Sequence, residues 1–414
     1  MISKNGLIAA LDIGSTKVCA AIARVENDQN LRLLGIGQQI SKGLKSGAIV
    51  DMEALEISIL NAVHSAEEMA SETIQNIVVG CSSGVMSEIG DVDVALSGRE
   101  ILEDDLKTLF SLAQNNLKMN QSRRIYPLEL IHAFPIGYTV DGNRFIRDPR
   151  GMFAERFGVS LHVVTLPSTV FKNLVQGVGR CHLELSQVVS SAYASALSTL
   201  VEDEMDLGVV LVNMGGGTTT FSVFSDGHCV ALGLIPLGGD HITSDIAQGL
   251  STPFSQAERL KTLYGSALVS SSDENETILV PQIGDDQATP GMQVTKASLN
   301  QIIYPRVEEI FEILKNKLDA LSSYKGATRR VVLTGGASQM FGLKEVASTI
   351  LGRGVRLGKP LHILGLSEGF SNPSFSTVLG LLKFSSEGYK QNLFVDMKTS
   401  SFKHNFFSFF RKLI

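Results

Sequence analysis

Three consecutive glycines stand between two apolar runs near the middle of the chain, and their setting is typical of a phosphate-binding turn. The stretch "LGVVLVNMGGGTTTFSVF", residues 207–224, predicts a strand, a glycine turn and a second strand. Consecutive backbone N–H groups in such a turn form a concave anion site, and glycine lets a phosphate approach closely. The residues assigned to this site are Asn213, Gly215, Gly216, Gly217 and Thr218.

A second stretch of the same kind lies near the N-terminus, "LIAALDIGSTKVCAAIARV", residues 7–25. Hydroxyl groups and a lysine in its turn add donors and positive charge for phosphates, and Asp12 is placed to hold magnesium through water. An ordinary tight β-turn explains either stretch alone. Two copies about 200 residues apart favour two halves of one fold that face a common ligand. The residues assigned here are Asp12, Gly14, Ser15, Thr16 and Lys17.

A third glycine turn follows a buried strand in "RRVVLTGGASQMFGLKEVASTIL", residues 329–351, with a helix expected from near Leu343. A nucleoside base or ribose fits against a turn that lacks bulky side chains, whereas a common α/β loop is the alternative. The residues assigned to this contact are Gly335, Gly336, Ala337 and Ser338.

The composition restricts the class of protein. The 414 residues allow two or three domains, and a hydrophobic content of 44% supports large cores. A net charge of −6 gives no reason to expect nucleic-acid binding. The four cysteines are widely spaced, which predicts reduced thiols rather than disulfides or zinc. The N-terminus becomes polar too early for a signal peptide, and no apolar run reaches the ~18 residues of a membrane span.

The C-terminal residues form a separate pattern. Residues 385–400 are polar and predict a flexible linker, and five phenylalanines then fall within residues 402–410. On a helical wheel they form an apolar face with basic flanks, which predicts an amphipathic helix at 401–414 lying on an anionic membrane. A terminal helix docked on the protein's own core is the alternative. The predicted membrane residues are Phe402, Phe406, Phe407, Phe409, Phe410, Arg411, Lys412 and Leu413.

The order of the three turns resembles the actin, Hsp70 and sugar-kinase superfamily, and within it the chain is similar to the FtsA family of bacterial cell-division proteins. The resemblance extends over residues 7–384. It is carried by "IPLGGDHITSDIAQGLSTPFSQAERLKTLYGSAL" (235–268), "LNQIIYPRVEEIFEILKNKL" (299–318) and "AFPIGYTVDGNRFIRDPRGMFAERFGVSLHVVT" (133–165).

This resemblance implies an α/β, actin-like fold of two lobes with an FtsA-type subdomain 1C and a C-terminal amphipathic helix. The expected boundaries are subdomain 1A at 1–83, 164–204 and 369–384, subdomain 1C at 84–163, subdomain 2A at 205–239 and 304–368, subdomain 2B at 240–303, the linker at 385–400 and the helix at 401–414.

The resemblance also implies a function. We expect an adaptor that binds ATP and magnesium, forms filaments with itself, and tethers FtsZ filaments to the cytoplasmic face of the inner membrane at the division site. Later membrane proteins of the divisome are further expected partners, and nucleic acid is not. Glu258 and Lys261 match adenosine-contacting positions of related folds, although a surface ion pair is the alternative.

Hydrolysis is expected to be slow or absent. Asn213 stands where the family usually has an aspartate, and Thr220 where many superfamily members have a second acid. An amide accepts a hydrogen bond from metal-bound water but has no charge to hold magnesium strongly. A sugar or acetate kinase and a chaperone-type ATPase are the rival functions; the first needs a carboxylate base, and the second needs a further substrate-binding domain.

Overall fold

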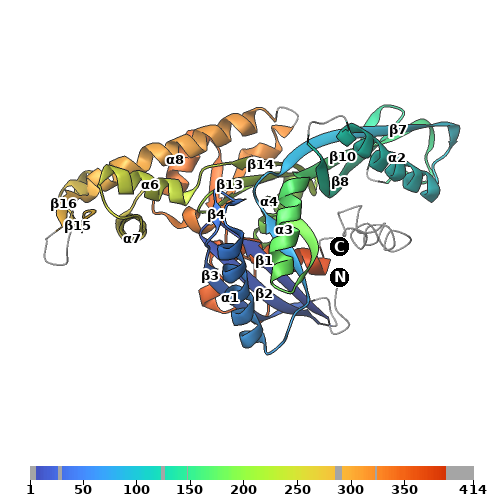
Figure 1. Cartoon of the computed structure of the whole chain (residues 1–414). Coiled ribbons are helices and arrows are strands. Elements are labelled where there is room, and N and C mark those ends of the chain that lie inside the picture. The colour runs from blue at the N-terminus through green and yellow to red at the C-terminus, as the bar shows by residue number, and fades with distance from the viewer. Residues whose placement is uncertain are drawn as a thin grey trace.

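Two five-stranded mixed sheets of the same design lie at the centre of the structure, a computed structural model (Figure 1). The structure describes residues 6–26, 30–122, 126–146, 148–284, 291–321 and 324–387. The predicted helix at 401–414 and nearly all of the predicted linker lie outside these ranges, so the predicted membrane residues do as well.

The first sheet has the order β11-β6-β1-β2-β3, and the second has the order β18-β17-β12-β13-β14. In each sheet three successive antiparallel strands are extended by two parallel strands on the side of the first strand. The duplication predicted from the two glycine turns is therefore present in the topology. The strands are β1 (Leu7–Ile13), β2 (Lys17–Val25), β3 (Leu31–Ile40), β6 (Asn76–Cys81) and β11 (Glu184–Ser190) in the first sheet, and β12 (Val209–Met214), β13 (Thr219–Ser225), β14 (His228–Ile235), β17 (Arg330–Thr334) and β18 (Gly354–Leu357) in the second.

Helices cover both faces of the first sheet. Consecutive residues of β1 and β2 are buried, as expected of strands packed on both faces. Asp51 caps the start of α1 by accepting hydrogen bonds from the N–H groups of Glu53 and Ala54. The short strands β4 (Leu44–Lys45) and β5 (Ala48–Ile49) precede this cap. The helices of this lobe are α1 (Met52–Ala70), α3 (Ser168–Arg180) and α10 (Ser376–Glu387).

Helix α4 (Ser191–Thr199) lies between the two sheets and contacts strands of both. Eight of its nine residues are buried, which is the pattern of a helix surrounded by protein on all sides. Most of these residues are alanine or serine, and the large exception is the fully buried Tyr193. The small side chains allow the two lobes to approach each other across this helix.

The second lobe extends away from its sheet to one side of the molecule (Figure 1). The short strands β15 (Thr277–Val280) and β16 (Met292–Thr295) pair antiparallel at its far end. In the hydrophobic core of this lobe, the second sheet packs with the buried face of the helix at Lys296–Asp319. The helices are α5 (Glu202–Leu207), α6 (Gly239–Gly249), α7 (Phe254–Tyr264), α8 (Lys296–Asp319) and α9 (Leu343–Leu351).

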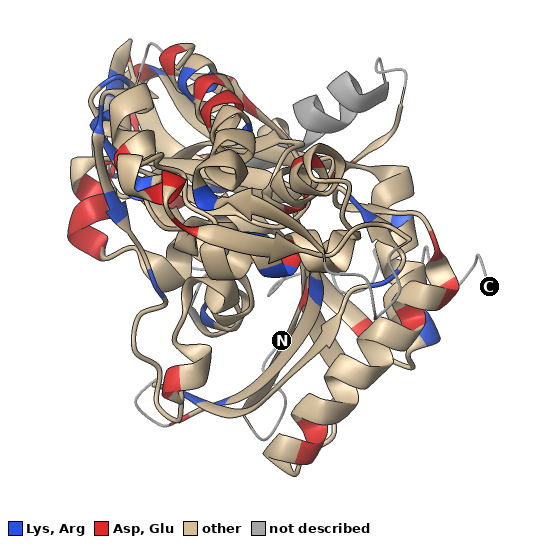
Figure 2. Cartoon of the chain, turned by 90° about the vertical axis from the view of Figure 1, so that its left-hand side faces the viewer, with Lys and Arg blue, Asp and Glu red and all other residues tan. Residues whose placement is uncertain are grey.

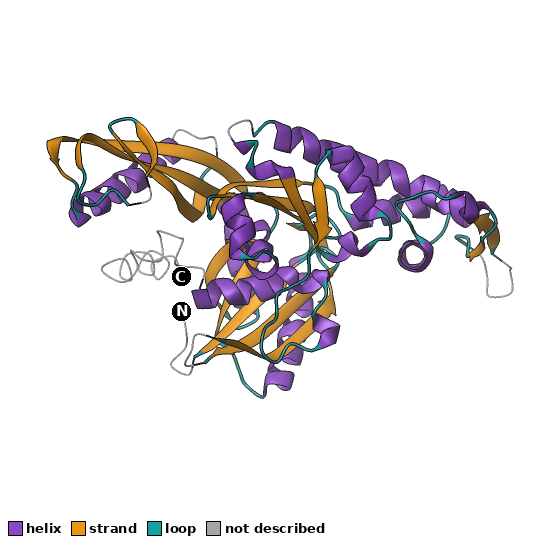
Figure 3. Cartoon of the chain, turned by 180° about the vertical axis from the view of Figure 1, so that it is seen from behind, coloured by secondary structure: helices purple, strands orange, loops and turns teal. Residues whose placement is uncertain are grey.

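A four-stranded sheet with the order β7-β10-β8-β9 projects on the opposite side, as the view from behind also shows (Figure 3). Its own small core packs Leu109 of α2 against the sheet residue Phe157, and both side chains are fully buried. The elements are β7 (Met86–Glu100), α2 (Glu103–Ser122), β8 (Leu128–Val140), β9 (Asn143–Ile146) and β10 (Phe153–Pro167).

This projecting sheet is also bonded to the second lobe, through edge strand β14. The Ser87 hydroxyl accepts from the Leu232 N–H at 3.1 Å and lies 2.6 Å from His162 Nε2. The other ring nitrogen, Nδ1, lies 2.8 Å from the Cys229 carbonyl oxygen. Burial lowers the pKa of His162 to about 4, so the ring is neutral at pH 7. A neutral imidazole with one donor and one acceptor satisfies both contacts.

The distribution of charged residues and the state of the cysteines agree with the expectations drawn from the composition. Acidic and basic residues are interspersed over the side that Figure 2 presents. All four cysteines are buried and free. Among the described helices, none combines the length and apolar character needed to cross a membrane.

Candidate functional site

The two predicted phosphate turns close in the same way. The Gly14 N–H donates to the Lys17 carbonyl at 3.1 Å, and the Gly215 N–H donates to the Thr218 carbonyl at 2.9 Å. Asp12 pairs with Cys19 in the first hairpin just as Asn213 pairs with Thr220 in the second. Asp12 and Asn213 therefore hold equivalent positions in the two hairpins.

The tips of the two hairpins are in direct contact. A Cβ atom on Gly216 would lie 1.7 Å from Thr16 Oγ1, and one on Gly217 would lie 2.4 Å from Ser15 Oγ. Side chains of the first turn thus occupy the space that a side chain of the second would need. The glycines at these two positions are explained by this close approach of the lobes, whether or not a phosphate is present.

Helix α6 begins against the second turn. The N–H groups of Gly239 and Asp240 donate to the Gly215 and Gly216 carbonyls, each at 2.9 Å. The Asp240 carboxylate accepts from Thr16 Oγ1 at 3.3 Å, and burial raises its pKa. Asp240 was not among the predicted site residues. The sequence does contain a feature that could have identified it, namely an acidic residue in the first turn of a helix that begins at a Gly-Gly pair.

Asp12 and Lys17 lie on the side of the first lobe. Burial raises the pKa of the Asp12 carboxyl to about 6, although the nearby Lys17 ammonium opposes this shift. Lys17 Nζ donates to Ser374 Oγ at 3.3 Å and lies 3.5 Å from the centre of the Phe375 ring. Burial lowers the pKa of Lys17. This lysine is therefore held by the segment that leads back into the first lobe.

Asn213 links the second hairpin to that same returning segment. Its Nδ2 donates to Thr377 Oγ1 at 3.0 Å, a bond that a carboxylate could make only as the acceptor. A Cβ atom on Gly335 would lie 2.3 Å from Asn213 Oδ1, and Gly335 has a φ of 90°. The third turn, which continues as a short 3-10 helix at Gly336–Gln339, is thereby fitted closely against the second.

Glu258 and Lys261 form the i,i+3 ion pair that the sequence offered as the alternative, with Nζ and Oε2 separated by 2.6 Å. Both also line the cleft described below. Lys261 donates in addition to the Gly239 carbonyl at 3.0 Å and to Thr243 Oγ1 at 2.7 Å. These two bonds from Lys261 therefore hold α7 against the start of α6.

These elements surround a cleft of about 1110 Å³. Ser338 does not line it, because its hydroxyl donates to the Gly335 carbonyl at 2.7 Å and the residue is buried. Among the described residues, no cluster of three or more His, Cys, Asp or Glu side chains could hold a metal. The predicted residues that do line the cleft are Asp12, Gly14, Ser15, Thr16, Lys17, Asn213, Gly215, Gly216, Gly217, Thr218, Glu258, Lys261, Gly335, Gly336 and Ala337.

Solved structures share this fold. A chain of the PilM–PilN type IV pilus biogenesis complex superposes with a TM-score of 0.66 at 15% identity, covering 92% of this chain and 98% of that one. MreB5 of Spiroplasma citri bound to ADP superposes with a TM-score of 0.52 at 15% identity, covering 93% and 97%. The duplicated sheets and these neighbours define an actin-like fold of mixed α/β class, as predicted.

The sequence relatives are more specific. The chain is 41% identical to cell division protein FtsA of Agrobacterium fabrum, over 92% of this chain and 87% of the relative. It is 33% identical to that of Pseudomonas aeruginosa, over 97% and 94%, and 32% identical to that of Escherichia coli K12, over 92% and 91%. Family models for cell division protein FtsA and for the SHS2 domain inserted in FTSA match residues 210–380 and 83–165. The chain belongs to the FtsA family of cell-division proteins.

Proposed function

We propose that the cleft binds ATP with magnesium. The observation that carries this proposal is the meeting of two identically closed turns, one from each lobe, beside the third glycine turn. Their N–H groups and hydroxyls suit phosphate oxygens, and the open surface of the third turn suits the nucleoside. MreB5 of Spiroplasma citri, which shares the fold, is described as bound to ADP in one structure and to AMPPNP in another.

The residues present fit a magnesium ion that relies on phosphates and water. Magnesium is usually bound in such sites by one or two carboxylates together with substrate phosphates. The cleft offers the carboxylates of Asp12 and Asp240 and the amide oxygen of Asn213. Asp12 would hold the hydrated ion, and the ion would supply charge neutralisation at the phosphates.

We further propose slow hydrolysis, because the second hairpin presents an amide and a hydroxyl at its acid positions. Asn213 and Thr220 lie opposite each other in the strand register, and Asn213 already donates to Thr377. Neither group removes a proton from water at neutral pH. The nucleotide would then act mainly on the arrangement of the lobes.

The role proposed for the whole chain is that of a cell-division adaptor that forms filaments with itself and tethers FtsZ filaments to the cytoplasmic face of the membrane. Membership of the FtsA family supports the cell-division role. The apolar and basic pattern at 401–414 supports the membrane contact. In this account subdomain 2B, at 240–303, faces FtsZ, and subdomain 1C, at 84–163, projects on the opposite side.

The test is recruitment of FtsZ to lipid. Fluorescent FtsZ is mixed with anionic vesicles and ATP, with the full chain or with a chain that ends at Ser400, and the vesicles are floated on a density gradient. The full chain should carry FtsZ to the lipid fraction, whereas the shortened chain should leave it at the bottom. Equal recruitment by both chains would contradict the adaptor role of the C-terminal residues.

A further inference from the structure

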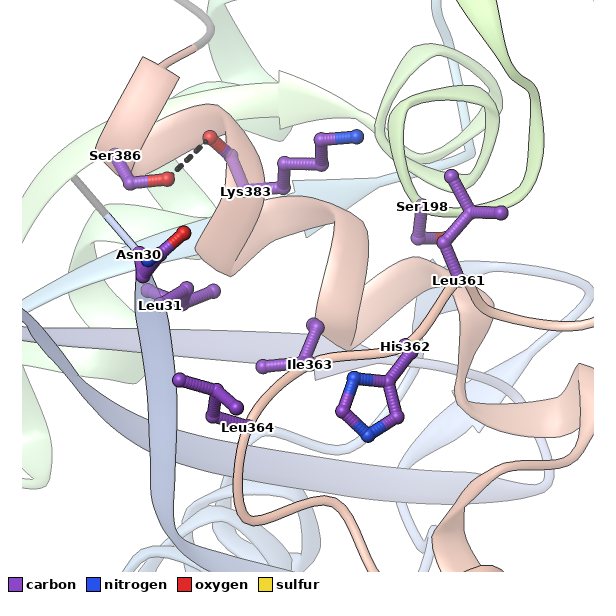
Figure 4. A pocket seen from close by; sticks show the side chains of 9 residues that line it. All are labelled: Asn30, Leu31, Ser198, Leu361, His362, Ile363, Leu364, Lys383 and Ser386. Carbon is purple, nitrogen blue, oxygen red and sulfur yellow. Dashed lines mark hydrogen bonds between the residues drawn. The ribbon is translucent and has the colours of Figure 1, made fainter. Parts of the chain in front are cut away.

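A second pocket, of about 360 Å³, lies where the lobes are joined and shares no lining residue with the cleft. Its walls come from the start of β3, the end of α4, residues 361–364 and the last turns of α10 (Figure 4). Residues 361–364 belong to the segment that follows β18 and leads back toward α10. The pocket therefore adjoins both α4 and this returning segment.

Hydrogen bonds fix the walls of this pocket. The Leu361 N–H donates to the Ser198 carbonyl at 2.6 Å, and the Leu33 N–H donates to the Leu364 carbonyl at 2.8 Å. Ser198 Oγ also donates to the Ser376 carbonyl at 2.7 Å. The pocket is thus preformed, and an occupant would not have to order its walls.

The lining combines apolar groups with one lysine and one histidine. Leu31, Leu361 and Ile363 supply apolar surface, and Lys383 and His362 supply nitrogen donors around it (Figure 4). No carboxylate is among the lining residues. Lys383 makes no ion pair within the part of the chain that the structure describes. Such a site suits an apolar side chain that is followed closely by a carboxylate.

The chain itself carries this combination a short distance beyond the pocket. Helix α10, which contributes Lys383 and Ser386 to the lining, is described as far as Glu387. Residues 393–396, which lie outside the described ranges, read Leu-Phe-Val-Asp. The seven residues from 387 to 394 reach at most about 24 Å when extended, which is ample for a return to the pocket.

We propose that residues 393–396 dock in this pocket, with Phe394 against the apolar lining and Asp396 paired with Lys383. A segment linked covalently to its site has an effective concentration in the millimolar range, so a weak contact is sufficient to hold it. Docking leaves only residues 397–400 between the pocket and the predicted membrane helix. The segment then shortens the linker and lies at the junction of the lobes, where lobe movement alters its site. This proposal does not depend on nucleotide binding in the cleft.

Tryptophan fluorescence tests the docking, because the chain contains no tryptophan. Phe394→Trp in the full chain, without lipid, places a single reporter in the segment. Its emission should be blue-shifted relative to the unfolded chain, and acrylamide should quench it several-fold less strongly. Adding Lys383→Asp should remove both effects, and a further Asp396→Lys should restore them. Lys344→Asp on α9, an exposed charge outside the pocket, is the matched control and should change neither.

Several outcomes would overturn the proposal. Emission typical of a solvated indole in Phe394→Trp, or equal quenching with and without Lys383→Asp, would show that the segment does not dock. Burial that increases with protein concentration would assign the pocket to a second copy of the chain. Burial that is lost in Phe406→Asp with Phe410→Asp, but not in Lys383→Asp, would assign it to the aromatic segment. If circular dichroism shows that Lys383→Asp unfolds the chain, Asp396→Lys alone replaces it, and this variant should likewise remove the blue shift and the protection from quenching.

Discussion

Thr16 and Asp240, which are 224 positions apart in the sequence, meet across the cleft with Thr16 Oγ1 donating to the Asp240 carboxylate at 3.3 Å. Thr16 belongs to the turn of the first hairpin, and Asp240 belongs to the first turn of α6 in the second lobe. This side-chain bond joins the lobes at the place where phosphates are expected. A ligand that enters between the turns must therefore compete with it or incorporate it.

Thr16→Val should weaken this junction. The substitution keeps the shape of the side chain and removes the donor, so the nucleotide-free chain should lose about 0.5–1.5 kcal/mol of unfolding free energy, with the lower value expected at an exposed bond. Urea unfolding measures this loss. Thr349→Val on α9, whose hydroxyl bonds only to a carbonyl of its own helix, is the control. An equal effect of both variants would mean that the contact contributes nothing.

Asn213→Asp should raise the rate of phosphate release. The new carboxylate adds charge beside the expected metal position, and the Thr377 hydroxyl can turn to donate to it. Colourimetric phosphate release with ATP and magnesium measures the rate, and Asn213→Ser serves as the uncharged control. Brisk turnover by the unchanged chain would show that Asn213 does not limit hydrolysis.

Asp12→Asn should stabilise the nucleotide-free chain above pH 6. Because burial raises the pKa of Asp12 from 3.8 to about 6, the folded chain binds the proton more tightly than the unfolded chain. The fold is therefore progressively destabilised by this group as the pH rises from about 4 to about 6, by up to about 3 kcal/mol. This value is an upper bound, since the residue is partly open to the cleft.

Urea unfolding of the unchanged chain and of Asp12→Asn between pH 4 and pH 8 measures this difference in stability. The two curves should converge at the acidic end and separate above pH 6, with the asparagine variant more stable. The same variant should bind ATP with magnesium more weakly, since it lacks the metal-facing charge. A variant that is less stable above pH 6 would show that the cleft favours the ionised carboxylate.

Liposome sedimentation should rank the C-terminal variants. The unchanged chain should bind anionic vesicles most strongly. The double variant Arg411→Glu with Lys412→Glu should bind more weakly, and the double variant Phe406→Asp with Phe410→Asp should bind least. Each lost basic residue costs about 1 kcal/mol near an anionic surface, whereas the aspartates break the apolar face itself. High salt should weaken vesicle binding by the unchanged chain only in part, because the apolar contribution to binding is not screened. Equal sedimentation of a chain that ends at Ser400 would contradict the membrane assignment.

The local pattern of the sequence was sufficient to predict the paired hairpins and the helix from Leu343. Each hairpin is an apolar, β-branched run interrupted by glycine, so the elements follow from neighbouring residues. The cleft residues of all three turns could be named for the same reason, and 13 of these 14 line the cleft. Ser338 is the exception, because a 3-10 helix replaces an open turn there and directs the hydroxyl inward.

Contacts between distant segments could not be predicted in this way. Lys17 is held by Ser374 and Phe375, and Asn213 by Thr377, across more than 160 positions of sequence. The sequence around Asp240 is that of an ordinary helix start. Only the packing of α6 on the second turn brings this residue to the cleft. These residues acquire their roles from the packing of the two lobes, which no local periodicity encodes.

Calorimetric titration of ATP with magnesium into Gly336→Asp tests the central claim most directly. A Cβ atom on Gly336 would have only Ser374 Cβ, at 3.6 Å, within contact distance, so the variant should fold while its carboxylate enters the cleft. Gly217→Glu is a less clean test, since its side chain would meet Ser15. The unchanged chain and the control Gly336→Ala should bind, and Gly336→Asp should show no heat of binding. Equal ATP affinity in Gly336→Asp and the unchanged chain, with both folded, would contradict the assignment of the cleft to nucleotide.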